Sequence, residues 1–190
     1  MKDVTLVVSH DEEGRLVYLL SSLNLIDNNI PFSQVLVLAK DDLSLEQSEK
    51  TLSKFIGKGI EGSVIKRPAE QNKVVFEFCE SPITTDWFVL LTDQGFVFPT
   101  YYELFVKEKK RFDTYGTLLS FYAPVLSPTA ARDGGAGMIY NTKVRNEFCH
   151  SLKKEQKLAT KDIVRKYTSF MKANKYDLYE HISEDLFFNK

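Results

Sequence analysis

Apolar runs alternate with more polar stretches through the first half of the chain. Short runs of apolar and β-branched residues predict strands buried on both faces, at residues 4–9, 34–39, 63–66 and 87–91. The segments between these runs predict helices, over residues 12–26, 44–56 and 72–79. This alternation indicates an α/β fold with an open, mostly parallel twisted sheet and helices on both faces.

The second half of the chain has a less regular order of elements. It predicts helices at residues 100–110, 143–153 and 160–174, and strands at residues 115–122 and 138–140. No internal repeat, low-complexity tract or linker divides the sequence. We therefore expect residues 1–190 to form a single compact domain.

The composition, with 43% hydrophobic and 27% charged residues, is typical of a soluble globular protein. A net charge of −1 argues against a protein that simply coats nucleic acid or membrane. The N-terminus lacks a signal-peptide pattern, and no apolar stretch approaches the ~18 residues that span a bilayer. Cys79 and Cys149 have no CxxC spacing, so we expect buried, reduced thiols and a cytoplasmic location.

Polar residues gather where the predicted strands end. They are His10, Asp11, Asp41, Asp42, Asp93 and Gln94. Open α/β sheets bind ligands beyond the carboxyl ends of their strands, so these residues predict a ligand site at one edge of the sheet. A solvated turn at Asp41 and Asp42, and a structural role for His10, are the alternatives.

Three common motifs are missing. The sequence has no GxGxxG after its first strand, no GxxxxGK[ST] and no GxSxG. Their absence disfavours a dinucleotide-binding Rossmann domain, a P-loop enzyme and an α/β-hydrolase. The three histidines show no zinc-ligand spacing.

Four segments carry a resemblance to a known family. They are Trp87-Phe88 leading into Thr92-Asp93-Gln94-Gly95-Phe96-Val97, Gly134-Gly135-Ala136-Gly137-Met138, Lys161-Asp162-Ile163-Val164 and Tyr179-Glu180-His181-Ile182. In order and rough spacing they resemble GT-A fold glycosyltransferases, most closely the fringe and core-1 galactosyltransferase group and, more loosely, relatives of N-acetylglucosaminyltransferase IV.

The resemblance implies transfer of a hexosyl or pentosyl group from a nucleotide sugar, a UDP-linked one, to an acceptor hydroxyl. It implies a nucleotide-binding half at residues 1–99 and a half at 100–190 that holds acceptor and donor sugar. The donor-binding residues that it implies are His10, Asp41, Asp42, Asp93, Gln94, Gly134, Gly135, Ala136 and Gly137. For the glycines, the alternative is a simple turn.

The resemblance also implies a divalent cation, Mn²⁺ or Mg²⁺, held by Asp93 and His181. The family has further acids around this aspartate, whereas this chain has the neutral Thr92 and Gln94. Metal dependence is therefore open, and Lys or Arg neutralising the leaving diphosphate is the alternative. Asp162 is the implied general base; an acid in the first turn of a helix is the other interpretation.

Basic residues form a stripe along the last predicted helix and the segment before it. Three of them, Lys157, Lys161 and Arg165, are our predicted acceptor contacts. They would suit a hydroxymethylated base in phage-type DNA. The simpler interpretation is the solvated basic face of an amphipathic helix, and a glycan or protein acceptor stays open. No membrane partner is expected.

A second hypothesis is a degenerate GT-A-like binding module without turnover. A sugar nucleotidyltransferase is disfavoured because Ser9-His10-Asp11-Glu12-Glu13 is not a Gly-rich phosphate loop.

Overall fold

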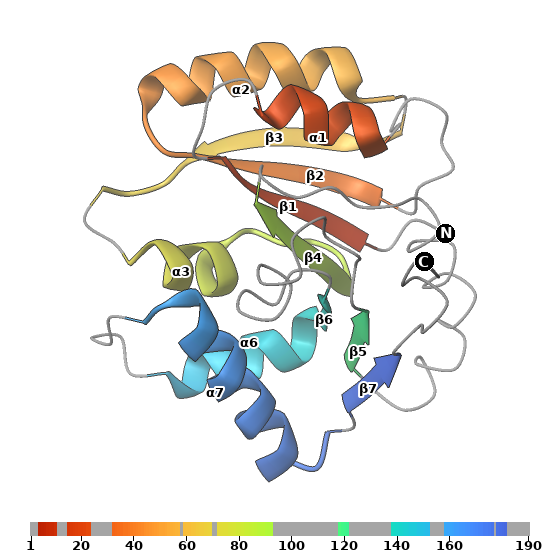
Figure 1. Ribbon diagram of the computed structural model, residues 1–190, viewed down its shortest axis with the longest axis vertical. Coiled ribbons are helices and arrows are strands. Elements are labelled where there is room, and N and C mark those ends of the chain that lie inside the picture. Colours follow the sequence, from red (N-terminus) through yellow and green to blue (C-terminus); the bar gives the residue numbers. More distant parts are fainter. Residues whose placement is uncertain are drawn as a thin grey trace, which may run out of the picture.

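The computed structural model places the sheet and most of the helices around it (Figure 1). The residues that the structure describes are 4–10, 15–23, 32–57, 59–69, 72–92, 118–121, 138–152, 158–176 and 178–181. The predicted helix at 100–110 lies outside them.

The described part of the chain contains one sheet of seven strands, in the order β3-β2-β1-β4-β6-β5-β7 (Figure 1). The strands are β1 (Val4–His10), β2 (Phe32–Ala39), β3 (Glu61–Lys66), β4 (Trp87–Thr92), β5 (Leu118–Phe121), β6 (Met138–Asn141) and β7 (Leu178–His181). Neighbours in the β3-β2-β1-β4 half are parallel, and β5 pairs with β7 in parallel, whereas β6 is antiparallel to β4 and β5. The expected open, mostly parallel sheet is confirmed.

Helices cover both faces of this sheet, as the alternation predicted (Figure 1). They are α1 (Arg15–Leu23), α2 (Asp42–Phe55), α3 (Lys73–Val75), α6 (Thr142–Ser151) and α7 (Thr160–Ala173). Helices α1 and α2 bury their apolar residues in one core, and α6 and α7 bury theirs in a second core. No helix among the described residues is long and apolar enough to cross a membrane.

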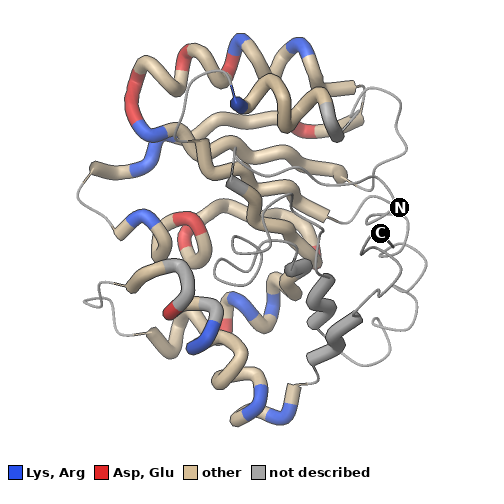
Figure 2. Tube along the Cα trace, viewed as in Figure 1, with Lys and Arg blue, Asp and Glu red and all other residues tan. Residues whose placement is uncertain are grey.

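Strand β1 lies at the centre of the sheet and all seven of its residues are buried. Val4, Leu6 and Val8 contribute to the core under α1 and α2, whereas Val7 packs into the core on the opposite face. Such burial on both faces explains why this strand reads as an almost continuous apolar run. Figure 2 shows the charged residues on helices and at strand ends, away from the lengths of β1 and β2.

The predicted helix at 72–79 consists of two parts. Asn72 caps α3 by accepting hydrogen bonds from the backbone N–H groups of Val74 and Val75, at 3.1 and 3.2 Å. The chain then continues as a π-helical turn, η2 (Phe76–Glu80), a rare conformation that is frequent at functional sites. Apolar periodicity places a helix here, but it does not reveal the change of helical type.

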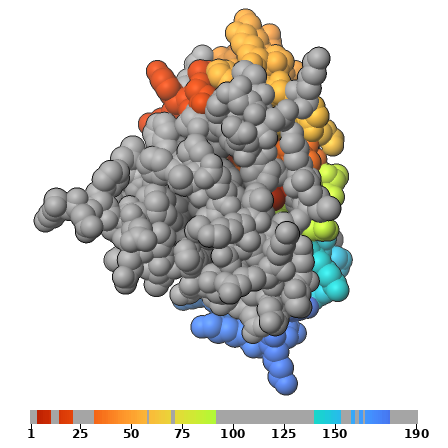
Figure 3. All heavy atoms as spheres, turned by 90° about the vertical axis from the view of Figure 1, so that its right-hand side faces the viewer, coloured from red at the N-terminus to blue at the C-terminus, as the bar shows by residue number. Residues whose placement is uncertain are grey.

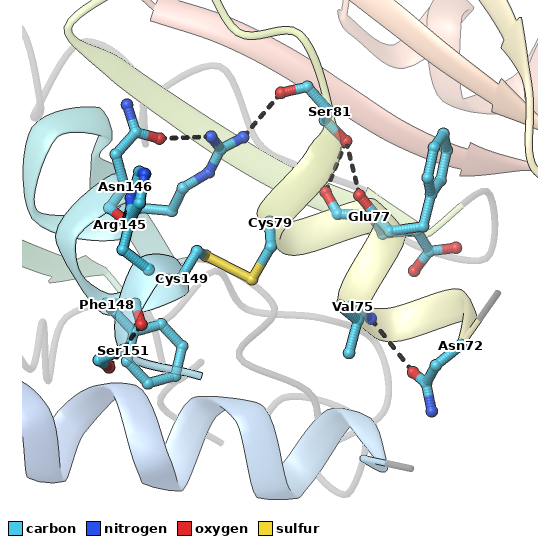
Figure 4. The surroundings of a disulfide bond; sticks show 12 residues. Asn72, Val75, Glu77, Cys79, Ser81, Arg145, Asn146, Phe148, Cys149 and Ser151 are labelled. Atoms are coloured by element: carbon cyan, nitrogen blue, oxygen red, sulfur yellow. Dashed lines mark hydrogen bonds between the residues drawn. A yellow bond between two sulfur atoms is a disulfide. The ribbon is translucent and has the colours of Figure 1, made fainter. Parts of the chain in front are cut away.

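The expectation of reduced thiols is wrong: the structure joins Cys79 in η2 to Cys149 in α6 by a disulfide (Figure 4). The two residues are 70 apart in the sequence, which is why their spacing showed no motif, and the packing of η2 against α6 brings their Cα atoms to 5.5 Å. The expected cytoplasmic location rested in part on reduced thiols and stays a prediction.

Helix α2 and helix α7 lie at opposite ends of the molecule, and the region of η2 and α6 lies along one side between them (Figure 3). The predicted strands at 115–122 and 138–140 are present as β5 and β6.

Strand β7 was not predicted. Its residues Leu178–His181 pair with β5 in the sheet. Its sequence mixes apolar and charged residues over only four positions, which gives too short a pattern to recognise.

We expect reduction of the disulfide to lower the melting temperature on the order of 10 °C, because the bond closes a long loop of the unfolded chain. Thermal unfolding followed by circular dichroism, with and without a reductant, measures this change. The Cys79→Ala/Cys149→Ala double variant is the control, since its melting temperature should not respond to the reductant. Equal melting temperatures for the oxidised and reduced wild-type chain would contradict the prediction.

Candidate functional site

The carboxyl ends of the parallel strands meet at one edge of the sheet, at the left in Figure 1. Ser9 and His10 end β1, and Arg67 follows β3 directly. The backbone N–H of Arg67 donates to the carbonyl of Ala39, the last residue of β2, at 2.8 Å. This bond holds the chain after β3 against the end of β2, so side chains from all three strands converge at the same edge.

A buried polar cluster lies at this edge and centres on Glu77 of η2. One oxygen of Glu77, Oε1, accepts a hydrogen bond from the Ser9 hydroxyl at 2.5 Å and another from Nη1 of Arg67 at 2.8 Å. The Nζ atom of Lys73, one helical turn before Glu77, lies 3.9 Å from the same oxygen. We call Ser9, Arg67, Lys73 and Glu77 the edge cluster.

Burial and the neighbouring groups shift the pKa of Glu77 in opposite directions. Burial raises the pKa of Glu77, while the hydrogen bond from Ser9 and the charges of Lys73 and Arg67 lower it, and burial has the largest effect. The Arg67 and Glu77 side chains are only 9% and 7% exposed. Removing one member of such a buried pair leaves the other charge without its partner, which typically destabilises a protein by about 3–5 kcal/mol.

His10 lies next to the edge cluster, at the last position of β1, and is 3% exposed. The structure thus places this predicted donor-binding residue at the expected edge. Its burial also fits the structural role that was the alternative.

The second pair of predicted donor residues has local roles. Asp41 caps α2: its Oδ1 accepts from the backbone N–H of Ser44 at 2.9 Å, and its own N–H donates to the Ser44 hydroxyl at 2.9 Å. Hydrogen bonds to its carboxylate from the backbone and side chain of Ser44 lower the pKa of Asp41. Asp42 forms an exposed ion pair with Lys66 at 2.6 Å. Neither role requires a ligand, although both residues lie at the predicted edge.

Asp162, the predicted general base, lies in the first turn of α7 and is partly exposed. Its Oδ1 is 3.4 Å from a guanidinium nitrogen of Arg165. The segment before α7 is tied to the start of α3, since Asn72 Nδ2 donates to the carbonyl of Leu158 at 3.2 Å. Asp162 therefore lies on a helix that begins beside α3, the helix that carries Lys73.

Several predicted site residues lie outside the described part of the chain: Asp93, Gln94, Gly134, Gly135, Ala136, Gly137 and Lys157. For Lys161 in α7 and His181 in β7 the structure describes the backbone but not the side chain. Residue 92 ends β4 and is paired in register with Ser9, which puts the chain that leads into Asp93 at the same edge. Among the described residues, no three His, Cys, Asp or Glu side chains are grouped so that they could hold a metal ion.

The sequence patterns did not reveal the edge cluster. They placed His10, several acids and one amide at strand ends, and for residues 72–79 they showed only the apolar side of a helix. Arg67 follows a predicted strand just as Asp41 does, so strand-end position could have found it. Glu77 sits between Phe76 and Phe78, which are both buried, and no local pattern marks it as buried too.

A separate surface depression of about 650 Å³ lies at the opposite edge, lined by residues 83–86 and by the outer side of α6. Residues 83–86 precede β4, so this hollow is at the amino end of that strand. We do not place the candidate site there, since the strand-end residues converge at the other edge.

The sequence matches no family model and no curated protein. Solved structures do resemble it. A cytidylyltransferase from Leptospira borgpetersenii serovar Hardjo-bovis superposes with a TM-score of 0.62 at 14% identity, over 97% of this chain and 77% of that one. Residues 1–349 of TarS from S. aureus, in complex with UDP-GlcNAc, superpose with a TM-score of 0.61 at 15% identity, over 97% of this chain and 57% of that one.

The chain has a GT-A-like fold. At these identities the similarity shows the fold alone, and the chain spans little more than half of the TarS fragment. The similarity does not single out the fringe and core-1 group. What the GT-A-like fold adds to the site is its location, because the described edge cluster occupies the edge where open α/β sheets bind ligands.

The two roles of Asp41 can be separated by substitution. Asp41→Ala removes the cap and should lower the melting temperature by about 2–4 °C, whereas Asp41→Ser keeps a good N-cap oxygen and should leave it nearly unchanged. Thermal unfolding of the three chains measures this. An unchanged melting temperature for Asp41→Ala would contradict the capping role; a ligand contact by the carboxylate would instead appear as weaker binding in both variants.

Proposed function

We propose that this chain is a nucleotide-sugar-dependent glycosyltransferase, which moves a sugar from a UDP-linked donor to an acceptor hydroxyl. The observation that carries the proposal is the convergence of Ser9, Arg67, Lys73 and Glu77 at the carboxyl edge of a GT-A-like sheet, where His10 ends β1. Anionic, hydroxyl-rich ligands suit an edge that combines guanidinium, ammonium and hydroxyl groups. The complex of the similar TarS fragment with UDP-GlcNAc supports the choice of donor class.

Within this proposal the two halves of the chain have different tasks. Residues 1–99 hold the nucleotide, with His10, Asp41 and Asp42 near base or ribose and Asp93 with Gln94 near the diphosphate. The glycine segment 134–137 approaches the donor sugar closely because it lacks bulky side chains. Asp162 takes the proton from the acceptor hydroxyl as that oxygen attacks the anomeric carbon.

A divalent cation belongs to the proposal only as a partner of Asp93 and His181. Carboxylate oxygens and water suit Mg²⁺ or Mn²⁺, and a bound cation would stabilise charge on the leaving diphosphate. Thr92 and Gln94 offer neutral oxygens at most, so the chain supplies a single carboxylate where the resembling family has more.

Donor binding and transfer test the proposal together. UDP-GlcNAc should raise the melting temperature, because a ligand that binds only the folded chain stabilises it. Slow release of UDP from UDP-GlcNAc, measured with and without Mn²⁺, should accompany binding. Asp93→Asn should abolish this release while leaving the thermal unfolding of the free chain unchanged.

A binding module without turnover predicts a different result. It would bind UDP-GlcNAc, and its melting temperature would rise, but no UDP would be released with any acceptor. If a panel of nucleotide sugars gave no thermal shift and no release of UDP, both forms of the proposal would be contradicted.

A nucleotidyltransferase is the second candidate, because the similarity to the cytidylyltransferase has a TM-score of 0.62. Such an enzyme would release pyrophosphate from CTP in the presence of a sugar phosphate or an alcohol phosphate. The Ser9-His10-Asp11-Glu12-Glu13 segment lacks the Gly-rich loop that would hold a triphosphate, so we place this candidate second.

The acceptor that we propose is a hydroxymethylated base in DNA, contacted by Lys157, Lys161 and Arg165. Arg165 is 77% exposed on α7, at the opposite end of the molecule from α2. A glycan or protein hydroxyl is the alternative acceptor. The predicted cytoplasmic location belongs to the same proposal, since DNA would be met there.

Charge reversal of the three basic residues to Glu should weaken binding of duplex DNA and flatten the dependence of its affinity on salt, because fewer counterions are released. Fluorescence anisotropy across a salt series measures both. Lys50→Glu/Lys54→Glu on the exposed side of α2 is the control and should bind as the wild-type chain does. Unchanged affinity and salt slope in the charge-reversed variant would remove the DNA hypothesis.

A further inference from the structure

We propose that Arg67, held in place by Glu77, binds the diphosphate of the donor. It would supply the positive charge that a metal ion supplies in GT-A enzymes with more acids at the positions around the one that Asp93 occupies here. This inference rests on the proposed function for its ligand, a nucleoside diphosphate. It assigns a binding role to Arg67 and a positioning role to Glu77, neither of which the sequence motifs include.

The position of the Arg67 side chain carries the first step. Arg67 follows β3, and β2 lies between β3 and β1 in the sheet. Its guanidinium nevertheless shares one carboxylate oxygen of Glu77 with the hydroxyl of Ser9 in β1. The side chain therefore extends from the end of β3 towards the end of β1. One carboxylate oxygen, Oε1 of Glu77, joins its guanidinium to the Ser9 side chain.

The next strand along the sheet carries the second step. Ser9 is paired in register with Thr92, the last residue of β4, and Asp93 follows it directly. Neighbouring strands are about 4.8 Å apart. The guanidinium is thus close to the strand end from which Asp93 emerges, which is where the proposed function places the diphosphate.

The balance of charge is the third step. Arg67 and Lys73 both approach Oε1 of Glu77, so two cationic groups meet around one carboxylate. A guanidinium matches the oxygens of a phosphate with a planar set of N–H donors and stays charged even when buried. On the other side, Thr92 and Gln94 bring no negative charge to attract a cation. A guanidinium at this edge can therefore bind a phosphate directly.

Glu77 fixes the direction of the guanidinium. Glu77 lies on the π-helical turn η2, and its carboxylate accepts a hydrogen bond from the Ser9 hydroxyl. Cys79, two residues later, is joined to α6 by the disulfide. Residues two apart on a helix point to different sides, so one turn is anchored to the sheet edge through Glu77 and to α6 through the disulfide. Arg67 can then meet a ligand without first losing the rotamer freedom of a long side chain.

Titration calorimetry with two probes, UDP-GlcNAc and inorganic pyrophosphate, tests the assignment. The wild-type chain should bind both in EDTA, with affinities within about threefold of those in Mn²⁺. Arg67→Lys should weaken both probes about tenfold or more, the loss expected when one charge-assisted hydrogen bond of about 1.4 kcal/mol is removed. Lys66→Gln is the matched control: Lys66 is the preceding residue, is half exposed and pairs with Asp42, and its loss should change neither affinity more than about twofold.

Glu77→Gln is the second variant, and it keeps the shape of the side chain if Arg67→Lys fails to fold. It should weaken pyrophosphate binding while the far-ultraviolet circular dichroism stays that of the wild-type chain. Wild-type affinity for pyrophosphate in a folded Arg67→Lys or Glu77→Gln variant would overturn the inference, as would loss of all binding by the wild-type chain in EDTA.

The outcomes also separate this inference from the proposed function. Binding of UDP-GlcNAc that is equal in the wild-type chain and Arg67→Lys overturns the role of Arg67 and leaves the glycosyltransferase intact. Binding of pyrophosphate that depends on Arg67, without binding of any nucleotide sugar, supports the anion site and removes the donor. Absence of binding by both probes overturns the inference.

Discussion

The burial of β1 between two hydrophobic cores is the constraint on which the rest of the structure depends. Its apolar side chains pack under α1 and α2 on one face and against the core of η2, α6 and α7 on the other. Strands β2 and β4 pair in parallel with its two edges, and these pairings fix the register of this half of the sheet. The end of this strand, Ser9 and His10, is therefore a rigid reference point for any ligand at the carboxyl edge.

A second constraint follows from the first, because the end of β1 is polar but still buried. The hydroxyl of Ser9 needs a partner, and Glu77 provides it. The buried carboxylate in turn needs a cation, and Arg67 reaches it from β3. Each polar group in the edge cluster thus satisfies the next, which links three separate segments of the chain at one point.

The sequence predicted the elements that apolar runs or helical periodicity mark, and it missed contacts between distant segments. Val4–His10 and Phe32–Ala39 each contain a run of apolar residues, so their strands and the parallel sheet could be recognised. Glu77 could not, because its burial follows from Ser9, 68 residues earlier, and from Arg67. The Cys79–Cys149 bond was missed for the same reason. Asp41 was placed correctly at a strand end, yet its side chain caps the next helix.

The link between η2 and α6 extends the edge cluster into the second core. Arg145 of α6 lies 5.3 Å over the ring of Phe88 in β4 and donates to the carbonyl of Ser81 at 2.8 Å, directly after η2 (Figure 4). Burial lowers the pKa of this guanidinium to about 10, so it remains a cation at neutral pH. The disulfide and Arg145 thus both hold the C-terminal end of this short π-helical segment against α6. Since the opposite side of that segment presents Glu77 to Ser9 and Arg67, the rigidity of the second core is transmitted to the edge of the sheet where the donor is proposed to bind.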